Sequence, residues 1–175
     1  MPPSLSEREK KILDTFDDIA ATILVLQRDG FSCRAAENLM DNFTRHVMVF
    51  FGGLITSDGE LNQRELEFFN YVVRHSFDFD EFQQRLERNL RGKPLQDWSD
   101  WVPEYFDTLL AYDRYRAVHT ADDLIMSLEE LGHIFSRLDS QHPEKTRFFE
   151  THLRTLRAYL EQNRGKIAMP SPGSL

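Results

Sequence analysis

The sequence has a single cysteine, no long apolar run and no surplus of basic residues. Cys33, being alone, excludes an intramolecular disulfide and favours a reducing compartment. The longest apolar run, residues 47–55, is too short to span a bilayer, and the N-terminus carries no apolar signal segment. We therefore expect a cytoplasmic protein.

Basic charge is scarce, with 21 Lys and Arg residues against 29 Asp and Glu residues and a net charge of −8. A protein that binds nucleic acid through its phosphates usually presents a basic surface, so the composition argues against nucleic acid as a partner. Residues 144–175 have a surplus of basic side chains, among them Arg147, Arg154 and Arg157. This surplus leaves peripheral association with an anionic membrane as an alternative.

Catalytic motifs are also missing. The chain contains no G-x-S-x-G elbow, no phosphate-binding glycine loop and no C-x-x-C pair. Glu130 and His133 have the Glu-x-x-His spacing used in di-iron four-helix bundles. Such a site needs a second Glu-x-x-His pair and two further Glu residues. No other histidine follows a glutamate by three residues. We therefore predict no enzyme, with a metalloenzyme that uses Glu130 and His133 as the remote alternative.

Helical periodicity, in contrast, runs through the whole chain and predicts an all-α fold. We expect a single domain of about seven helices over residues 1–166, followed by a disordered tail over residues 167–175. Residues 50–69 and residues 133–149 each combine a helix, an acidic turn and a second helix with a Phe pair. The fold is therefore expected to contain two related helical hairpins.

The first helix is expected to begin near Ser4, which has the spacing of a capping box with Glu7, or near Ser6. It should end at Gly30, because glycine adopts positive φ without strain. Its buried stripe is expected to consist of Ile12, Phe16, Ile19, Ile23 and Leu26.

The second helix is apolar on all sides over residues 47–55, which predicts a central position in the fold. It contains Gly52 and Gly53, each of which costs about 1 kcal/mol relative to alanine in a helix. We therefore expect another helix to cross closely at this point.

The segment SDGELNQRE, residues 57–65, comes closest to a chemical signature. Aligned as a calcium EF-hand loop with its glycine at the sixth position, it places Asp58 and Glu65 at ligand positions. The first ligand position falls on Leu54, so this is not a working EF-hand. Asn62 and Glu65 also have the spacing of a helix N-cap with a capping box, which explains the segment without a metal.

The longer segment GGLITSDGELNQRELEFF, residues 52–69, resembles the motif of the tellurite-resistance TerB-like family. The resemblance implies an acidic seven-helix fold, a non-catalytic binding role in stress response, and a divalent cation, calcium or another, held by acidic turns. Under it, the cation ligands are Asp58, Glu60 and Glu65. In the weaker second copy Asp139 stands in the place of the acid, although that turn lacks the Asp-Gly pair.

An aromatic series beside the longest connection, residues 92–103, supports a different function. Trp98, Trp101 and Tyr105 follow one another here, and aromatic residues are enriched at binding hot spots. The alternative is therefore a protein-interaction module without a metal, which binds a protein partner through the region from Trp98 to Tyr115 with the two tryptophans exposed. The same pattern is also typical of a helix core.

Overall fold

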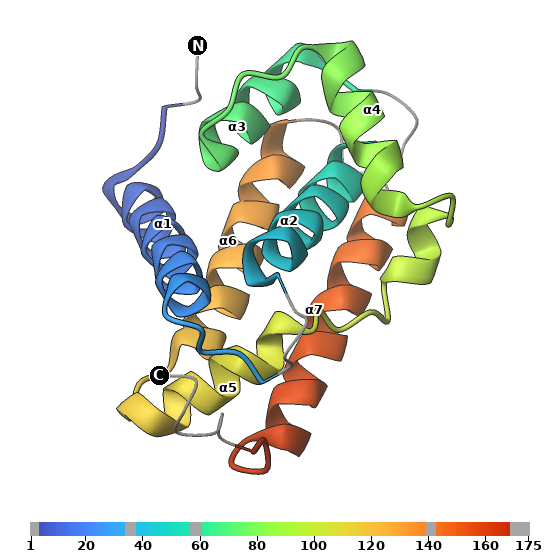
Figure 1. The fold of residues 1–175 in the computed structure, drawn as a ribbon. Coiled ribbons are helices and arrows are strands. Elements are labelled where there is room, and N and C mark those ends of the chain that lie inside the picture. Colours follow the sequence, from blue (N-terminus) through green and yellow to red (C-terminus); the bar gives the residue numbers. More distant parts are fainter. Residues whose placement is uncertain (1–3, 34–37, 57–60, 139–142, 169–175) are drawn as a thin grey trace.

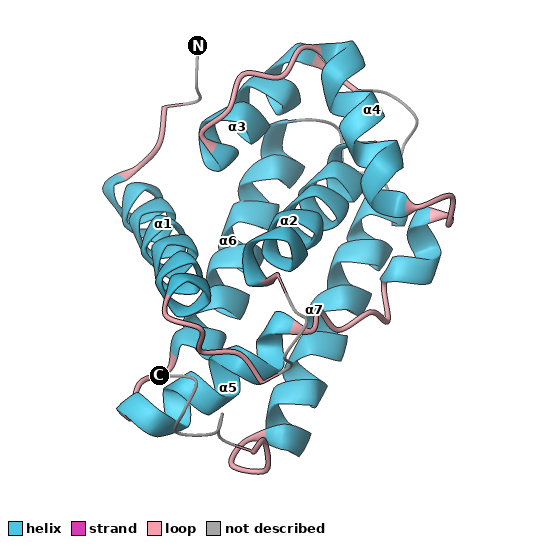
Figure 2. Ribbon diagram, in the orientation of Figure 1, coloured by secondary structure: helices cyan, strands magenta, loops and turns pink. Residues whose placement is uncertain are grey.

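The computed structural model describes residues 4–33, 38–56, 61–138 and 143–168. Within these ranges the chain is all-helical, as predicted, and contains no strand (Figure 2). None of the described helices is long and apolar enough to cross a membrane. The elements are α1 (Glu7–Arg28), α2 (Leu39–Thr56), α3 (Gln63–Val73), α4 (Phe79–Leu90), the short 3-10 helix η1 (Leu95–Trp98), α5 (Tyr105–Arg116), α6 (Thr120–Leu138) and α7 (Pro143–Asn163).

Helix α2 lies at the centre of the fold (Figure 1) and contacts each of the other helices. Every residue from His46 to Ile55 is buried, which confirms the expected central position. The two glycines permit close approach, because a Cβ on Gly52 would lie 2.8 Å from Leu86 Cδ1 and a Cβ on Gly53 2.4 Å from the Leu95 side chain. The predicted close crossing is therefore confirmed, and it involves α4 and η1.

Side-chain caps explain where α1 and α3 begin. Asn62 Oδ1 accepts a hydrogen bond from Glu65 N at 2.9 Å, and Glu65 Oε2 accepts one from Asn62 N at 3.3 Å, so the predicted capping box of α3 is confirmed. Helix α1 begins after Ser6, one of the two expected positions, and its capping box is formed by Ser6 and Glu9 rather than by Ser4 and Glu7. Glu9 also binds Arg137 of α6, a long-range contact that favours this register and that local spacing does not reveal.

The end of the chain returns to the body of the fold. The prediction of a disordered tail over residues 167–175 concerns mainly residues outside the described ranges. Ile167, which is described, packs against the core. Cys33 also packs against the core, and its Sγ lies 3.7 Å from Ala168 O.

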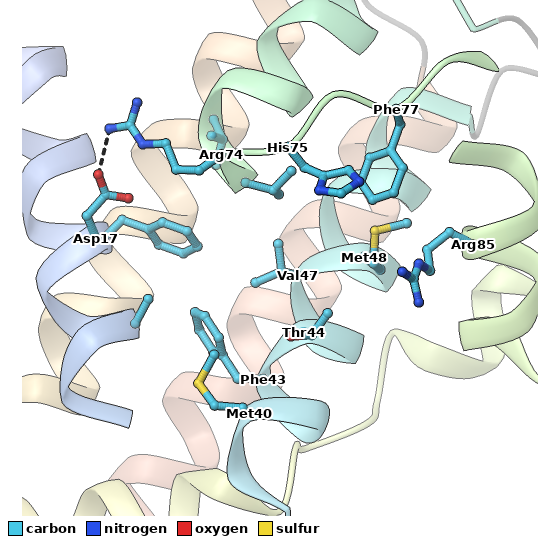
Figure 3. A pocket seen from close by; sticks show the side chains of 14 residues that line it. Asp17, Met40, Phe43, Thr44, Val47, Met48, Arg74, His75, Phe77 and Arg85 are labelled. Atoms are coloured by element: carbon cyan, nitrogen blue, oxygen red, sulfur yellow. Dashed lines mark hydrogen bonds and ion pairs between the residues drawn. The ribbon is translucent and has the colours of Figure 1, made fainter. Parts of the chain in front are cut away.

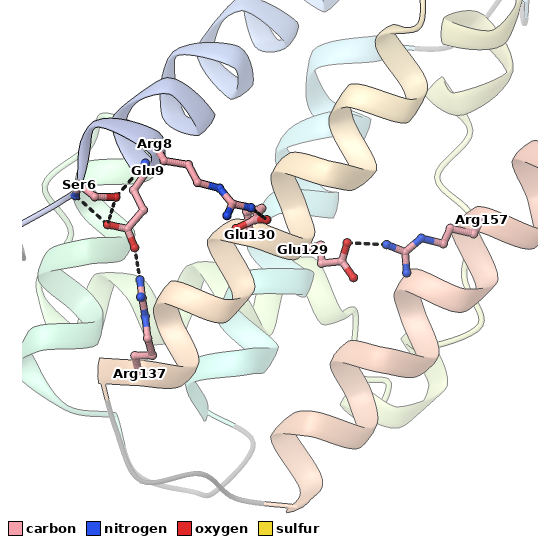
Figure 4. A network of polar contacts seen from close by, with 7 residues as sticks. All are labelled: Ser6, Arg8, Glu9, Glu129, Glu130, Arg137 and Arg157. Carbon is pink, nitrogen blue, oxygen red and sulfur yellow. Dashed lines mark hydrogen bonds and ion pairs between the residues drawn. The ribbon is translucent and has the colours of Figure 1, made fainter.

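Ion pairs join the outer helices (Figure 4). Glu130 and Arg137 of α6 pair with Arg8 and Glu9 of α1, and Glu129 of α6 pairs with an arginine of α7. Because exposed pairs of this kind contribute only about 0 to 1 kcal/mol each, they orient the helices more than they stabilise them. The stability of the contact comes from the apolar stripe of α1, in which Leu13 rather than the expected Ile12 is buried.

Gly132 marks the crossing of α6 and α7, and Gly132→Ala is expected to destabilise the protein. A Cβ at this position would lie 2.1 Å from Phe149 Cε2, so a buried ring would have to move. In an open helix the change would stabilise by about 1 kcal/mol, but overpacking a core costs about 1 to 3 kcal/mol. We expect a net loss of up to about 2 kcal/mol in urea unfolding. Adding Phe149→Leu should recover part of this loss, and a more stable Gly132→Ala protein would contradict the prediction.

Candidate functional site

A cavity of about 330 Å³ lies between α1, α2 and the connection from α3 to α4 (Figure 3). Its floor consists of buried apolar side chains that include Phe16 of α1, Phe43 and Val47 of α2, and Val72 of α3. Ligand pockets in proteins typically have volumes of about 300 to 1,000 Å³ and mostly apolar walls. Two other hollows, beside η1 and between α6 and α7, measure about 360 and 470 Å³ but are lined mainly by polar and charged residues.

The connection from α3 to α4 is held in place over this cavity. Arg74 ends α3 in the left-handed conformation, with φ 54° and ψ 43°, which costs a residue with a Cβ about 1 to 2 kcal/mol. Asn70 Nδ2 donates to Phe77 O at 2.8 Å, and Asn70 Oδ1 accepts from Phe77 N at 3.0 Å. The His75 ring packs against the Phe77 ring with centroids 4.0 Å apart. These contacts position Arg74, His75 and Phe77 at the cavity wall.

Charged groups lie on two sides of the cavity (Figure 3). On one side Arg74 Nη2 donates to Asp17 Oδ2 at 2.6 Å and thereby links the end of α3 to α1. This hydrogen bond raises the pKa of Arg74 above its ordinary value. On the other side lies Arg85 of α4, beside a polar recess of about 190 Å³. His75, Phe77 and Arg85 line both the cavity and the recess.

Of the four predicted cation ligands, Asp58, Glu60 and Asp139 lie outside the described residues. Glu65 is described and is 1% exposed. Its Oε1 accepts a hydrogen bond from Lys145 Nζ at 3.0 Å, and the Lys145 side chain is also buried. No group of three or more His, Cys, Asp or Glu residues in the described ranges is placed to hold a metal ion. The cation site stays a prediction.

The ion pair between Glu65 and Lys145 joins corresponding positions of the two hairpins. Glu65 is the third residue of α3 and Lys145 the third residue of α7. Each precedes its Phe pair, which begins at Phe68 or at Phe148, by three residues. All four of these Phe rings are buried. The ion pair therefore connects the start of α3 to the start of α7 through the interior of the protein.

The aromatic region lies largely inside the protein. Trp98 is 7% exposed and Tyr105 1%, while Trp101 is half-buried and meets Trp98 edge-on with ring centroids 4.8 Å apart. The expectation that Trp98 is exposed is wrong, because η1 turns its ring into the core and Lys93 lies over it. A role for Trp98, Trp101 and Tyr105 in binding a protein partner stays a prediction.

Tyr105 belongs to a buried chain of hydrogen bonds that extends over two histidines. Its hydroxyl lies 2.6 Å from His46 Nδ1, His46 Nε2 lies 2.8 Å from His152 Nε2, and His152 Nδ1 lies 3.2 Å from Ser99 O. Because a carbonyl oxygen only accepts, His152 Nδ1 carries the proton and His152 Nε2 accepts from His46 Nε2–H. His46 Nδ1 then accepts from the Tyr105 hydroxyl. Each of these ring nitrogens has a partner when both rings are neutral.

Burial favours the neutral form of each group in this histidine chain. It lowers the pKa of His46 well below its ordinary value, and the neighbouring His152 lowers it further. Burial also lowers the pKa of His152 to about 4 and raises the pKa of Tyr105. The chain is therefore a structural element that depends on deprotonated histidines.

The two residues of the metalloenzyme alternative have separate surroundings. Glu130 pairs with Arg8 of α1. His133 is exposed, and its ring meets the Phe149 ring edge-on at 5.3 Å. These contacts give Glu130 and His133 each a structural role that needs no metal.

No protein-family model, no curated protein and no solved structure matches this chain. The resemblance to the TerB-like family stays a prediction from residues 52–69.

The cavity itself was not predicted from the sequence. Phe43 and Val47 have the periodicity of an ordinary core stripe, which gives no sign that space remains beside them. The one local signal is the string VVRHSF, residues 72–77, in which an apolar helix end runs directly into Arg-His and then an aromatic residue.

Proposed function

We propose that this protein is a non-catalytic binding domain that holds an apolar small molecule in the cavity between α1, α2 and the α3–α4 connection. The observation that carries the proposal is the volume of about 330 Å³ above a buried apolar floor. Moving apolar surface of a ligand from water to such a floor contributes about 25 cal/mol per Å². The connection held by Asn70 supports the proposal, because a wall that is already ordered costs little to arrange on binding.

The polar residues around the cavity also favour binding over catalysis. Asp17 is engaged in its ion pair with Arg74, and His75 packs against Phe77. A nucleophile or general base would need a reacting partner within hydrogen-bond distance. Asp17 and Arg74 bind each other and the His75 ring packs on Phe77, so we assign these three residues to the shape and charge of the site.

Filling the cavity tests the proposal with a matched pair of substitutions. Ala20 of α1 lines the cavity and is half-buried, while its neighbour Ala21 is exposed. Ala20→Phe places a ring in the cavity, and Ala21→Phe adds the same ring to the surface. We expect the neutral probe N-phenylnaphthylamine to gain fluorescence with the wild type and with Ala21→Phe. Its affinity for Ala20→Phe should be lower by about tenfold or more, which corresponds to about 1.4 kcal/mol.

Circular dichroism provides the control, since both variants should keep the helical signal of the wild type. Equal probe binding by the Ala20→Phe and Ala21→Phe proteins would overturn the proposed function. Absence of probe binding to the wild type would do the same.

A further inference from the structure

The polar recess beside the cavity has the position of a second compartment of the same site. It is lined by His75, Phe77, Glu81, Gln84, Arg85 and Arg88. Three of these residues also line the apolar cavity, so the two spaces meet at the α3–α4 connection. A molecule with its apolar part in the cavity would place its other end in the recess.

The recess contains two guanidinium groups that make no ion pair with any other described residue. Arg85 and Arg88 are one turn apart on α4, so they lie on the same face of the helix, and both are exposed. The acidic side chain in the recess, Glu81, is engaged in a helix cap, since its Oε2 accepts from Asp78 N at 3.2 Å. The two guanidinium groups outnumber the one carboxylate of Glu81, so the recess has a surplus of positive charge in a chain whose net charge is −8.

We infer that the ligand of this site is an amphipathic anion, whose apolar chain occupies the cavity and whose acidic head is bound by Arg85 and Arg88. The inference rests on the proposed function and specifies the class of ligand. A guanidinium group offers a planar pair of donors that matches a carboxylate or a phosphate. A neutral head such as a hydroxyl can accept a hydrogen bond from a guanidinium group, but it cannot form the ion pair or the two parallel bonds of a carboxylate or phosphate. Fatty acids and alkyl phosphates both have the required chemistry.

Three ligands with the same alkyl chain and different heads test the inference. Decanoic acid, decanol and decyl phosphate are titrated calorimetrically into the wild-type protein, each below the concentration at which it aggregates. We expect at least one of the two acids to bind about tenfold or more tightly than decanol, because hydrogen bonds between two ionised groups are stronger than those to a neutral hydroxyl. The acid that binds more tightly identifies the head group as carboxylate or phosphate.

The variants Arg85→Gln and Arg88→Gln identify the groups that bind the head. Each is expected to weaken the tighter-binding acid by about tenfold and to leave the affinity for decanol unchanged. The matched control is Arg116→Gln, which removes the same charge from an exposed position at the end of α5. It should leave the affinity for the acid unchanged.

The outcomes separate the two proposals. If decanol binds as tightly as both acids, the anionic head is refuted while the apolar site stands. The inference is equally overturned if Arg116→Gln weakens the acid as much as Arg85→Gln and Arg88→Gln do. If none of the three ligands binds and N-phenylnaphthylamine does not bind either, the proposed function itself fails.

Discussion

The substitution Lys145→Met is expected to lower the free energy of unfolding by about 3 to 5 kcal/mol, the usual cost of removing one partner from a buried ion pair. Lys145 Nζ lies 3.0 Å from Glu65 Oε1, and both side chains are almost completely buried. Methionine has a similar length and fits an apolar site, so lost volume contributes little. The loss arises because the Glu65 carboxylate remains in the interior while the ammonium group that faces it is removed.

Chemical unfolding in urea measures this loss, with two further variants for comparison. Lys11→Met, at an exposed position of α1, should change the free energy of unfolding by less than about 0.5 kcal/mol. The double variant Lys145→Met with Glu65→Gln should recover part of the loss, because glutamine is uncharged and can still form the capping box with Asn62. If Lys145→Met is no more destabilising than Lys11→Met, the buried pair does not stabilise the fold.

The buried histidine chain is expected to make the protein sensitive to mild acid. In the unfolded chain both rings take up a proton near the ordinary histidine pKa of about 6.5. In the folded protein burial lowers the pKa of His152 to about 4, and the interactions with the backbone of Ser99 and Trp98 and with the Asp100 carboxylate offset this only in part. His46 is lowered as well. The unfolded state therefore binds more protons over this range, and the free energy of unfolding falls as the pH falls.

From His152 alone, the loss between about pH 7 and about pH 5 should be about 2 kcal/mol. A proton added to the contact between the two Nε2 atoms would place two N–H groups opposite each other. This explains why the free energy of unfolding falls as the pH falls. Urea unfolding at both pH values measures the difference. The variant His152→Gln, whose amide can still accept from His46, should be less stable than the wild type at pH 7 yet lose less on acidification. The variant His119→Gln, at an exposed position, is the control. If His152→Gln and His119→Gln lose the same free energy of unfolding between pH 7 and pH 5, the buried histidine chain is not the cause of the acid sensitivity.

Those parts of the fold that depend on neighbours in the sequence could be predicted. The capping box of Asn62 and Glu65 needs two residues three positions apart, and the spacing is visible in the string NQRE. The central position of α2 follows from apolar residues on every side of one helix. The close approach at Gly52 and Gly53 follows from two unfavourable residues in a helix that is otherwise well packed.

The features that govern the candidate site depend on residues far apart in the sequence. His46 and His152 are 106 positions apart, and no local pattern announces that their rings meet. The cavity arises from the shape left between α1, α2 and the α3–α4 connection, whereas periodicity describes one helix at a time. The burial of Trp98 is a further case, since an aromatic residue in a long connection has no periodicity that specifies its direction.

The contact between α1 and α6 also affects the order in which the chain acquires its structure during synthesis. Arg8 and Glu130 are in contact but lie 122 positions apart. At ribosomal rates of about 5 to 20 residues per second, the start of α1 is made about 6 to 24 s before its partner on α6. During this interval α2 can cover only part of the apolar stripe of α1. Until α6 is made, the nascent protein therefore presents a partly uncovered amphipathic helix, which makes this segment a natural target for chaperones that bind apolar surfaces.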